Sequence, residues 1–132
     1  MLRFVGCDVH KRTAVFTILL QDGQLFGTYT VPVTREALAA FAERQLTGED
    51  RLAMEATTNT WAVAGVLRPF VKEIVIGNPL KVRAIAEAKI KTDKVDSRVL
   101  AELLRSVLFA LALTVLLRLG QCAQLAVPLG FE

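Results

Sequence analysis

The chain has 132 residues, a length that suits one domain with its own hydrophobic core. Apolar residues make up 53% of the sequence and the mean hydropathy is +0.44, both high for a water-soluble domain. The net charge of +3 permits nucleic-acid binding without establishing it. The N-terminus is not a signal peptide, because Asp8, His10 and Lys11 interrupt the apolar core that such a peptide needs.

The sequence contains two cysteines, Cys7 and Cys122. Cys7 falls within an expected buried strand, so we predict a structural thiol there rather than a disulfide. Two cysteines of this kind suit the reducing conditions of the cytoplasm. We therefore predict a cytoplasmic protein.

The first third of the chain predicts a three-stranded antiparallel meander. Asp22-Gly23 lies between two runs rich in β-branched and aromatic residues, and this pair is a strong signal for a hairpin turn. Gly27, inside the third run, indicates a bulge or a close backbone approach. The three expected strands cover residues 2–9, 13–20 and 25–33.

Helices and strands then alternate. Thr34 is a good N-cap for a helix over residues 35–45, and Thr58 or Asn59 can cap a second helix that ends near Pro69. Two further strands are expected at 51–56 and 73–77. In the second of these Ile74, Val75 and Ile76 are all apolar, as in buried parallel strands.

Two more helices are expected before the C-terminal segment. Pro79 favours the first position of a helix that runs to about Ala88. Thr92 can cap the next helix, which would bury Val95, Leu100 and Leu103.

This order predicts an α/β fold, a mixed five-stranded sheet with helices on both faces. It is the connectivity of the ribonuclease H-like fold, of which the RuvC-like domains are a branch. The first and fourth strands are neighbours in that fold. Asp8 and Glu55 close those two strands, so we expect them to lie together at the carboxyl edge, where open α/β sheets place ligand sites.

Four carboxylates form the candidate site: Asp8, Glu55, Asp93 and Asp96. The spacing of Asp93 and Asp96 would bring both to one face of a helix. Mg²⁺ prefers oxygen ligands, and two Mg²⁺ ions about 4 Å apart need several carboxylates. Taken singly, each acid has a plainer reading as a solvated strand end or as an acid beside a helix N-terminus. Together they predict a two-metal site that handles phosphodiesters.

Basic side chains surround the acidic pair. Lys89, Lys91 and Lys94 are either a solvated basic run or contacts to nucleic-acid phosphates, which position a strand without reading its sequence. His10, the only histidine, is either a surface or supporting residue or, with Lys11, a further phosphate contact. Trp61 is expected to pack in the core rather than to stack on a base.

Three motifs resemble those of a bacterial transposase family, the insertion-sequence family with a DEDD active site on a RuvC-like domain. They are V-G-C-D-V-H-K at 5–11, M-E-A-T at 54–57, and N-P at 78–79 followed by I-K-T-D-K-V-D-S at 90–97 and L-A at 100–101. The resemblance runs from about Phe4 to Arg105, and the three motifs occur in the family's order.

The resemblance implies that Asp8, Glu55, Asp93 and Asp96 are metal-binding catalytic acids. It also implies a DNA recombinase that cleaves and rejoins strands during transposition. Family members are RNA-guided, work as oligomers, and carry a second domain that supplies a serine nucleophile. Mg²⁺, DNA, a guide RNA and a second copy of the chain are therefore the expected cofactor and partners.

The sequence departs from the family pattern after Arg105. We divide it into a DEDD transposase domain at 1–105 and an apolar, atypical tail at 106–132, expected to begin as a continuation of the preceding helix. The apolar run before Arg118 is shorter than the roughly 20 residues that span a bilayer, so no membrane span is expected. These 132 residues contain no recognisable serine domain, an ending that we would expect of a truncated or frameshifted copy.

These observations predict the catalytic N-terminal domain of a DEDD transposase, incomplete for recombination without the serine domain. Two alternatives stay open. The domain is either an inactive nucleic-acid-binding module, or a free-standing junction resolvase or nuclease on the same fold.

Overall fold

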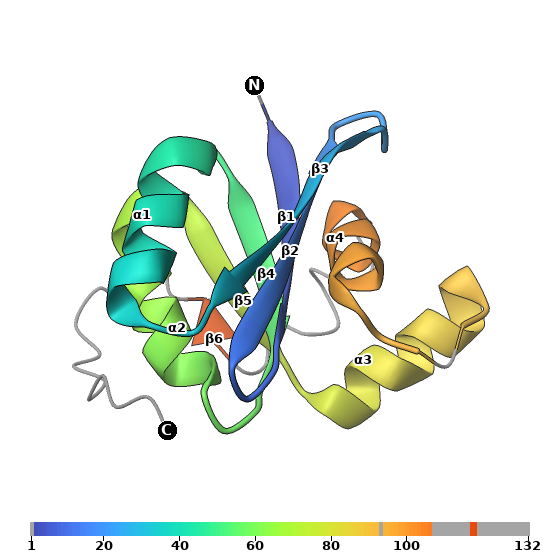
Figure 1. The fold of residues 1–132 in the computed structure, drawn as a ribbon. Helices are drawn as coiled ribbons and strands as arrows, with labels where there is room; N and C mark the ends of the chain where they lie inside the picture. The colour runs from blue at the N-terminus through green and yellow to red at the C-terminus, as the bar shows by residue number, and fades with distance from the viewer. Residues whose placement is uncertain (1, 93, 107–116, 119–132) are drawn as a thin grey trace.

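The computed structural model describes residues 2–92, 94–106 and 117–118, and shows a mixed sheet between two layers of helices (Figure 1). The strand order is β3-β2-β1-β4-β5-β6. The predicted ribonuclease H-like fold is confirmed, with β6 added to the five expected strands. The strands are β1 (Arg3–Val9), β2 (Thr13–Leu20), β3 (Leu25–Pro32), β4 (Arg51–Glu55), β5 (Glu73–Gly77) and β6 (Leu117–Arg118).

β1 lies at the centre of the sheet, antiparallel to β2 and parallel to β4. The β2–β3 turn contains Gly23 at φ +91°, a left-handed conformation that glycine adopts without strain. The register between β2 and β3 shifts beside Gly27, so the predicted bulge is present. The meander therefore forms as expected from its turn residues.

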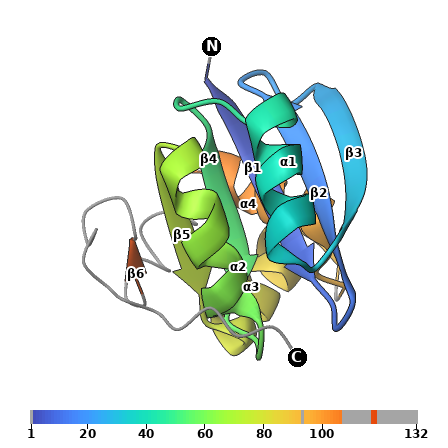
Figure 2. The same cartoon turned by 60° about the vertical axis from the view of Figure 1, so that its left-hand side comes forward.

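One face of the sheet is covered by α1 (Arg35–Gln45) and α2 (Thr60–Leu67), as Figure 2 shows from the side. α1 begins as predicted, because Thr34 Oγ1 accepts a hydrogen bond from Ala37 N at 3.1 Å. Cys7 is fully buried in this layer as a free thiol. Trp61 packs against the same core, as expected. η1 (Arg68–Phe70), a 3₁₀ turn, leads from α2 to β5.

The opposite face carries α3 (Pro79–Ile85), the π-helical turn η2 (Ala86–Ile90) and α4 (Ser97–Arg105). Leu100 and Leu103 of α4 pack on Phe4 and Ala53 of the sheet, forming a second core. α3 and η2 extend beyond the sheet on this side (Figure 1). The helix expected from Pro79 to about Ala88 is confirmed, with the π-helical turn at its end.

α4 does not begin where the sequence predicted. Asp96, not Thr92, is its N-cap: the Asp96 backbone is extended, and its Oδ1 accepts from Val99 N at 3.0 Å. Thr92 instead bonds Lys94 locally, with Thr92 Oγ1 accepting from Lys94 N at 3.2 Å. The expectation that Asp93 and Asp96 share a helical face is therefore wrong, because Asp96 precedes the first helical turn.

The C-terminal segment is described only in part. α4 ends at Arg105, and Ser106 takes an extended conformation. The sequence predicted that this helix continues into the tail, and at Ser106 that prediction is wrong. Residues 107–116 and 119–132, including Cys122, lie outside the described residues. β6 pairs antiparallel with β5. In the part of the chain that the structure describes, no helix is both long and apolar enough to cross a membrane.

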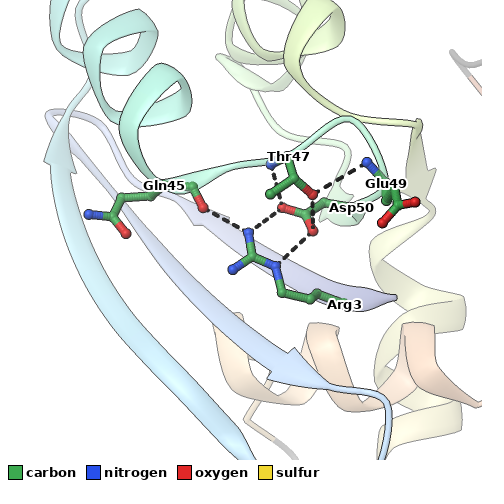
Figure 3. A network of polar contacts seen from close by, with 5 residues as sticks. All are labelled: Arg3, Gln45, Thr47, Glu49 and Asp50. Atoms are coloured by element: carbon green, nitrogen blue, oxygen red, sulfur yellow. Dashed lines mark hydrogen bonds and ion pairs between the residues drawn. The ribbon is translucent and has the colours of Figure 1, made fainter. Parts of the chain in front are cut away.

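A buried ion pair closes the amino end of the sheet (Figure 3). Arg3 donates from Nε to Asp50 Oδ1 at 2.9 Å and from Nη2 to Asp50 Oδ2 at 2.7 Å. Arg3 Nη2 also donates to the carbonyl oxygen of Gln45 at 2.8 Å. Thr47 donates to both Asp50 oxygens, from N at 2.9 Å and from Oγ1 at 3.0 Å. The network ties β1 to the α1–β4 connection.

Candidate metal and nucleic-acid site

The β1–β4 register brings the first two candidate acids to one edge of the sheet. Gly6 pairs with Ala53 and Cys7 with Met54, so Asp8 and Glu55 follow at the next position of each strand. Side chains alternate between faces along a strand, and Ala53 lies in the core under α4. Asp8 and Glu55 therefore lie on the α4 face, at the carboxyl ends of their strands.

The two carboxyl groups interact electrostatically. Burial is the main cause that raises the pKa of Glu55, and the charge of Asp8 raises it further, while Arg83 lowers it. Burial also raises the pKa of Asp8, against the lowering effect of His10, and the charge of Asp96 adds to the rise. The charge of Asp8 thus interacts with those of two other acids, in surroundings that disfavour its negative charge.

Gly6 allows α4 to bring Asp96 to this edge. A Cβ atom at Gly6 would clash with the carbonyl oxygen of Ser97 and lie 2.6 Å from Ala101 N. The bare backbone of β1 therefore lets the first turn of α4 pack directly on the strand. A buried hydrogen bond of 2.7 Å between the hydroxyls of Thr17 and Ser97 fixes the same turn to β2. Asp96 is the residue immediately before this anchor.

The fourth predicted acid, Asp93, lies outside the described residues. Among the residues that are described, no three His, Cys, Asp or Glu side chains are grouped closely enough to hold one metal ion. Asp96 uses Oδ1 to cap α4, and Asp8 uses Oδ2 to contact His10. The structure therefore places Asp8 within electrostatic reach of both Glu55 and Asp96, although the three side chains as they stand are not close enough to surround one ion.

His10 and Lys11 lie in the turn that follows β1. His10 Nε2 is 3.1 Å from Asp8 Oδ2, and the His10 side chain is 56% exposed against 26% for Asp8. The position of His10 therefore fits both expected roles, as a residue that supports Asp8 and as an exposed contact for a phosphate group. Lys11 is exposed.

The three lysines in and beside the third motif, Lys89, Lys91 and Lys94, are all exposed. Lys89 belongs to η2, and Lys91 follows it with a left-handed backbone at φ 61°. Lys94 is close enough to Asp8 to lower the pKa of that acid, the smallest of the influences on it. Lys89, Lys91 and Lys94 thus run from the projecting η2 toward the carboxylates.

A pocket of about 280 Å³ opens at the same edge of the sheet, between the β1–β2 turn and the β4–α2 loop. From the sequence, Thr58 and Asn59 of this loop were expected only as possible helix caps, and Thr57 only as the end of the M-E-A-T motif. Asn59 is indeed the N-cap residue of α2, yet its side chain makes no capping hydrogen bond. The pocket is lined by Val9, His10, Lys11, Thr57, Thr58 and Asn59.

The strand order, with acids at the carboxyl ends of its central parallel strands, defines a ribonuclease H-like domain. A family model supports this class: the DEDD transposase family of the IS110 type, described as a transposase, matches residues 5–115. The chain belongs to this transposase family. No curated protein shows significant similarity to it.

Proposed function

We propose that the described domain supplies the metal-binding carboxylates with which a transposase cleaves and transfers DNA strands. The observation that carries the proposal is the convergence of Asp8, Glu55 and Asp96 at one edge of the sheet, with Asp8 electrostatically coupled to both of the others. Three acids from separate elements are costly to hold together unless a cation compensates their charge.

The chemistry of the donors fits Mg²⁺. Carboxylate oxygens are the ligands that this ion prefers, and it keeps part of its water shell. Asp8, Glu55 and Asp96 would hold it, with Asp93 as the fourth donor that the resemblance implies. Two bound ions would stabilise the attacking and leaving oxygens of a phosphodiester. The strands β1 and β4 orient Asp8 and Glu55, and the cap of α4 orients Asp96.

The basic side chains support DNA as the substrate. Lys89, Lys91 and Lys94 offer cations in sequence along one side, leading to the acids, and His10 and Lys11 offer donors on the other side of Asp8. Contacts of this kind position a phosphate backbone without reading bases. The described domain would therefore hold one strand across the sheet edge, with a phosphate beside Asp8.

Further parts of the proposal follow from the family. A guide RNA and a second copy of the chain are proposed partners, and a serine nucleophile from another domain would complete strand transfer. A cytoplasmic location is proposed as well, in keeping with the buried, free thiol of Cys7.

The test measures binding and cleavage of a labelled four-way DNA junction by the purified chain. We expect Mg²⁺ or Ca²⁺ to tighten binding by roughly tenfold, and Asp8→Asn to remove this metal effect. Asp22→Asn, in the exposed β2–β3 turn, is the matched control.

Cleavage in Mg²⁺ that Asp8→Asn abolishes would favour a nuclease or resolvase that acts alone. Metal-dependent binding without cleavage would favour a binding module or half of a composite site. An Asp8→Asn variant that matches the wild type in both metal response and cleavage would contradict the proposal.

A further inference from the structure

The pocket beside the carboxylates contains a buried amide with no partner. Asn59 is only 6% exposed, and within the described residues its side chain makes no hydrogen bond. The Asn59 amide is nevertheless not sealed off from solvent. In the described part of the chain, Arg51 Nε is the only side-chain nitrogen or oxygen that is both fully enclosed and without a hydrogen bond, and the Asn59 amide atoms are not of this kind. A ligand with a matching edge would give this amide the hydrogen bonds that it lacks within the described part of the protein.

Thr57 lines the same pocket, and its hydroxyl can only accept a further hydrogen bond. Thr60 Oγ1 donates its single proton to the carbonyl oxygen of Glu55 at 2.5 Å. It must therefore accept from Thr57, both from N at 2.9 Å and from Oγ1 at 2.8 Å. The Thr57 hydroxyl thus donates its proton to Thr60 Oγ1 and can only accept a hydrogen bond from a ligand.

These donors and acceptors exclude a simple anion site. Asn59 offers one donor and one acceptor side by side, and Thr57 needs a donor from the ligand. A phosphodiester group offers acceptors alone, so it would leave the Thr57 oxygen and the Asn59 side-chain carbonyl without a donor. The fitting ligand has a flat edge with an acceptor and an amino group that carries two hydrogens.

We propose that this pocket binds one unpaired adenine or cytosine, the two bases whose Watson–Crick edge places an exocyclic amino group beside a ring nitrogen that only accepts. Asparagine pairs in this bidentate way with adenine, and the second amino hydrogen would reach Thr57. The volume of about 280 Å³ lies at the small end of ligand pockets and suits a single base rather than a duplex. Lys11, also on the lining, would meet the phosphate of the same nucleotide.

The proposal rests on the proposed function, since the strand held at Asp8 supplies the base. Val9 follows Asp8 directly, and Thr57 lies two residues after Glu55, so pocket and carboxylates share both strand ends. The base selected would belong to a nucleotide next to the phosphate at the acids. The pocket would therefore add sequence preference to a site whose other contacts are to the backbone.

Fluorescence anisotropy with short labelled oligothymidylates tests this. The central position carries adenine, cytosine, thymine or an abasic residue, and EDTA keeps the metal out. We expect adenine and cytosine to bind roughly tenfold more tightly than the abasic strand, with thymine between them. Asn59→Ala and Thr57→Val should remove the preference, whereas Thr57→Ser, which keeps the hydroxyl, should preserve it.

The preference is the ratio of the affinities of one variant for the adenine strand and for the abasic strand. A variant that binds all strands more weakly therefore keeps this ratio. Thr57 is exposed, which keeps Thr57→Val informative if Asn59→Ala fails to fold. Equal wild-type affinity for adenine and abasic strands, or an undiminished preference in Asn59→Ala, would overturn the proposal. If the wild type shows the base preference in EDTA but Mg²⁺ and Ca²⁺ do not tighten its binding to the junction, the proposed function is contradicted and the base pocket is not.

Discussion

Asp8 is the residue on which the electrostatics of the site depend. It is partly buried, its charge interacts with those of Glu55 and Asp96, and its Oδ2 lies 3.1 Å from His10 Nε2. Burial and the neighbouring acid raise its pKa, so the folded state holds its proton more tightly than the unfolded chain does. Ionised Asp8 therefore destabilises the metal-free domain, and a cation would reverse that penalty.

Asp8→Asn should stabilise the metal-free domain and remove its response to Mg²⁺. For an acid with a raised pKa the penalty is absent below the ordinary value of 3.8 and complete above the folded-state pKa. The advantage of the variant in EDTA should therefore grow as the pH rises through that window, to a few degrees in Tm at neutral pH.

Thermal melts with and without Mg²⁺ measure both effects. At a free Mg²⁺ concentration a hundredfold above Kd, the wild type should gain about 2.7 kcal/mol, and Asp8→Asn should gain nothing. Glu55→Gln should behave in the same way, because the pKa of Glu55 is also raised by burial. If Asp8→Asn is less stable than the wild type in EDTA, the electrostatic explanation is wrong.

At the scale of elements, the packing of α4 on β1 places Asp96. Gly6→Ala forces a methyl group against backbone atoms of Ser97 and Ala101. Backbone atoms inside a helix cannot move aside as the end of a flexible side chain can. We expect a loss of about 3 kcal/mol in the free energy of unfolding, and a weaker Mg²⁺ response because Asp96 moves with the helix. Urea unfolding measures the first and metal-dependent melts the second.

Gly48→Ala is the matched control for this change. Gly48 lies in the exposed α1–β4 loop, and a Cβ atom there would have no neighbour within 4 Å. Its stability should stay within about 0.5 kcal/mol of the wild type. A Gly6→Ala variant as stable as Gly48→Ala would show that α4 does not pack on β1 as described.

The second element with a testable role is the basic run of η2 and the segment after it. Lys89→Ala and Lys91→Ala should each reduce the salt dependence of duplex binding by about 0.9 in log–log slope, if each contacts one phosphate. Lys72→Ala, an exposed lysine just before β5, should leave the slope unchanged. Slopes that are unchanged in all three variants would show that Lys89 and Lys91 point into solvent and do not contact DNA phosphates.

Local patterns predicted these elements well where one residue type decides the structure. Strands 13–20 and 73–77 and helix 35–45 have the predicted bounds, because β-branched runs, the Asp22-Gly23 turn and the Thr34 cap act locally. The start of α4 was missed because Thr92 and Asp96 are both competent caps. The choice is made by distant contacts, the Gly6 backbone and the Thr17 hydroxyl, which no local pattern contains.

For the site, strand order placed Asp8 and Glu55 at neighbouring strand ends, and the register bears this out. The pocket was not recognised from the sequence, since Asn59 looks like an ordinary cap candidate and Thr57 like the end of the M-E-A-T motif until their hydrogen bonds are known. The ion pair of Arg3 and Asp50 was also missed, because the two residues are 47 positions apart. A charge at the start of an apolar strand was the only signal available.

At the scale of the whole molecule, the Arg3–Asp50 network holds the end of the sheet opposite the site. Asp50 is fully buried and accepts from both Arg3 and Thr47 (Figure 3). Asp50→Ala leaves an uncompensated buried guanidinium, so we expect a loss of about 3–5 kcal/mol in the free energy of unfolding. Urea unfolding with circular dichroism measures this.

The double variant Arg3→Met/Asp50→Leu should recover much of that loss, because it removes both charges. Glu102→Gln, which breaks the partly exposed Arg105–Glu102 pair at 3.1 Å, should cost no more than about 1 kcal/mol. A cost for Asp50→Ala no larger than that for Glu102→Gln would mean that the network contributes little to the fold.

The central claim is that β1, β4 and α4 together form a metal site in this transposase domain. Anomalous diffraction from crystals grown with Mn²⁺, which replaces Mg²⁺ at oxygen sites, tests it most directly. We predict an anomalous peak with Asp8 and Glu55 oxygens at about 2.0–2.2 Å, and its loss in Asp8→Asn. A fully occupied Mn²⁺ elsewhere, with none between Asp8 and Glu55, would contradict it.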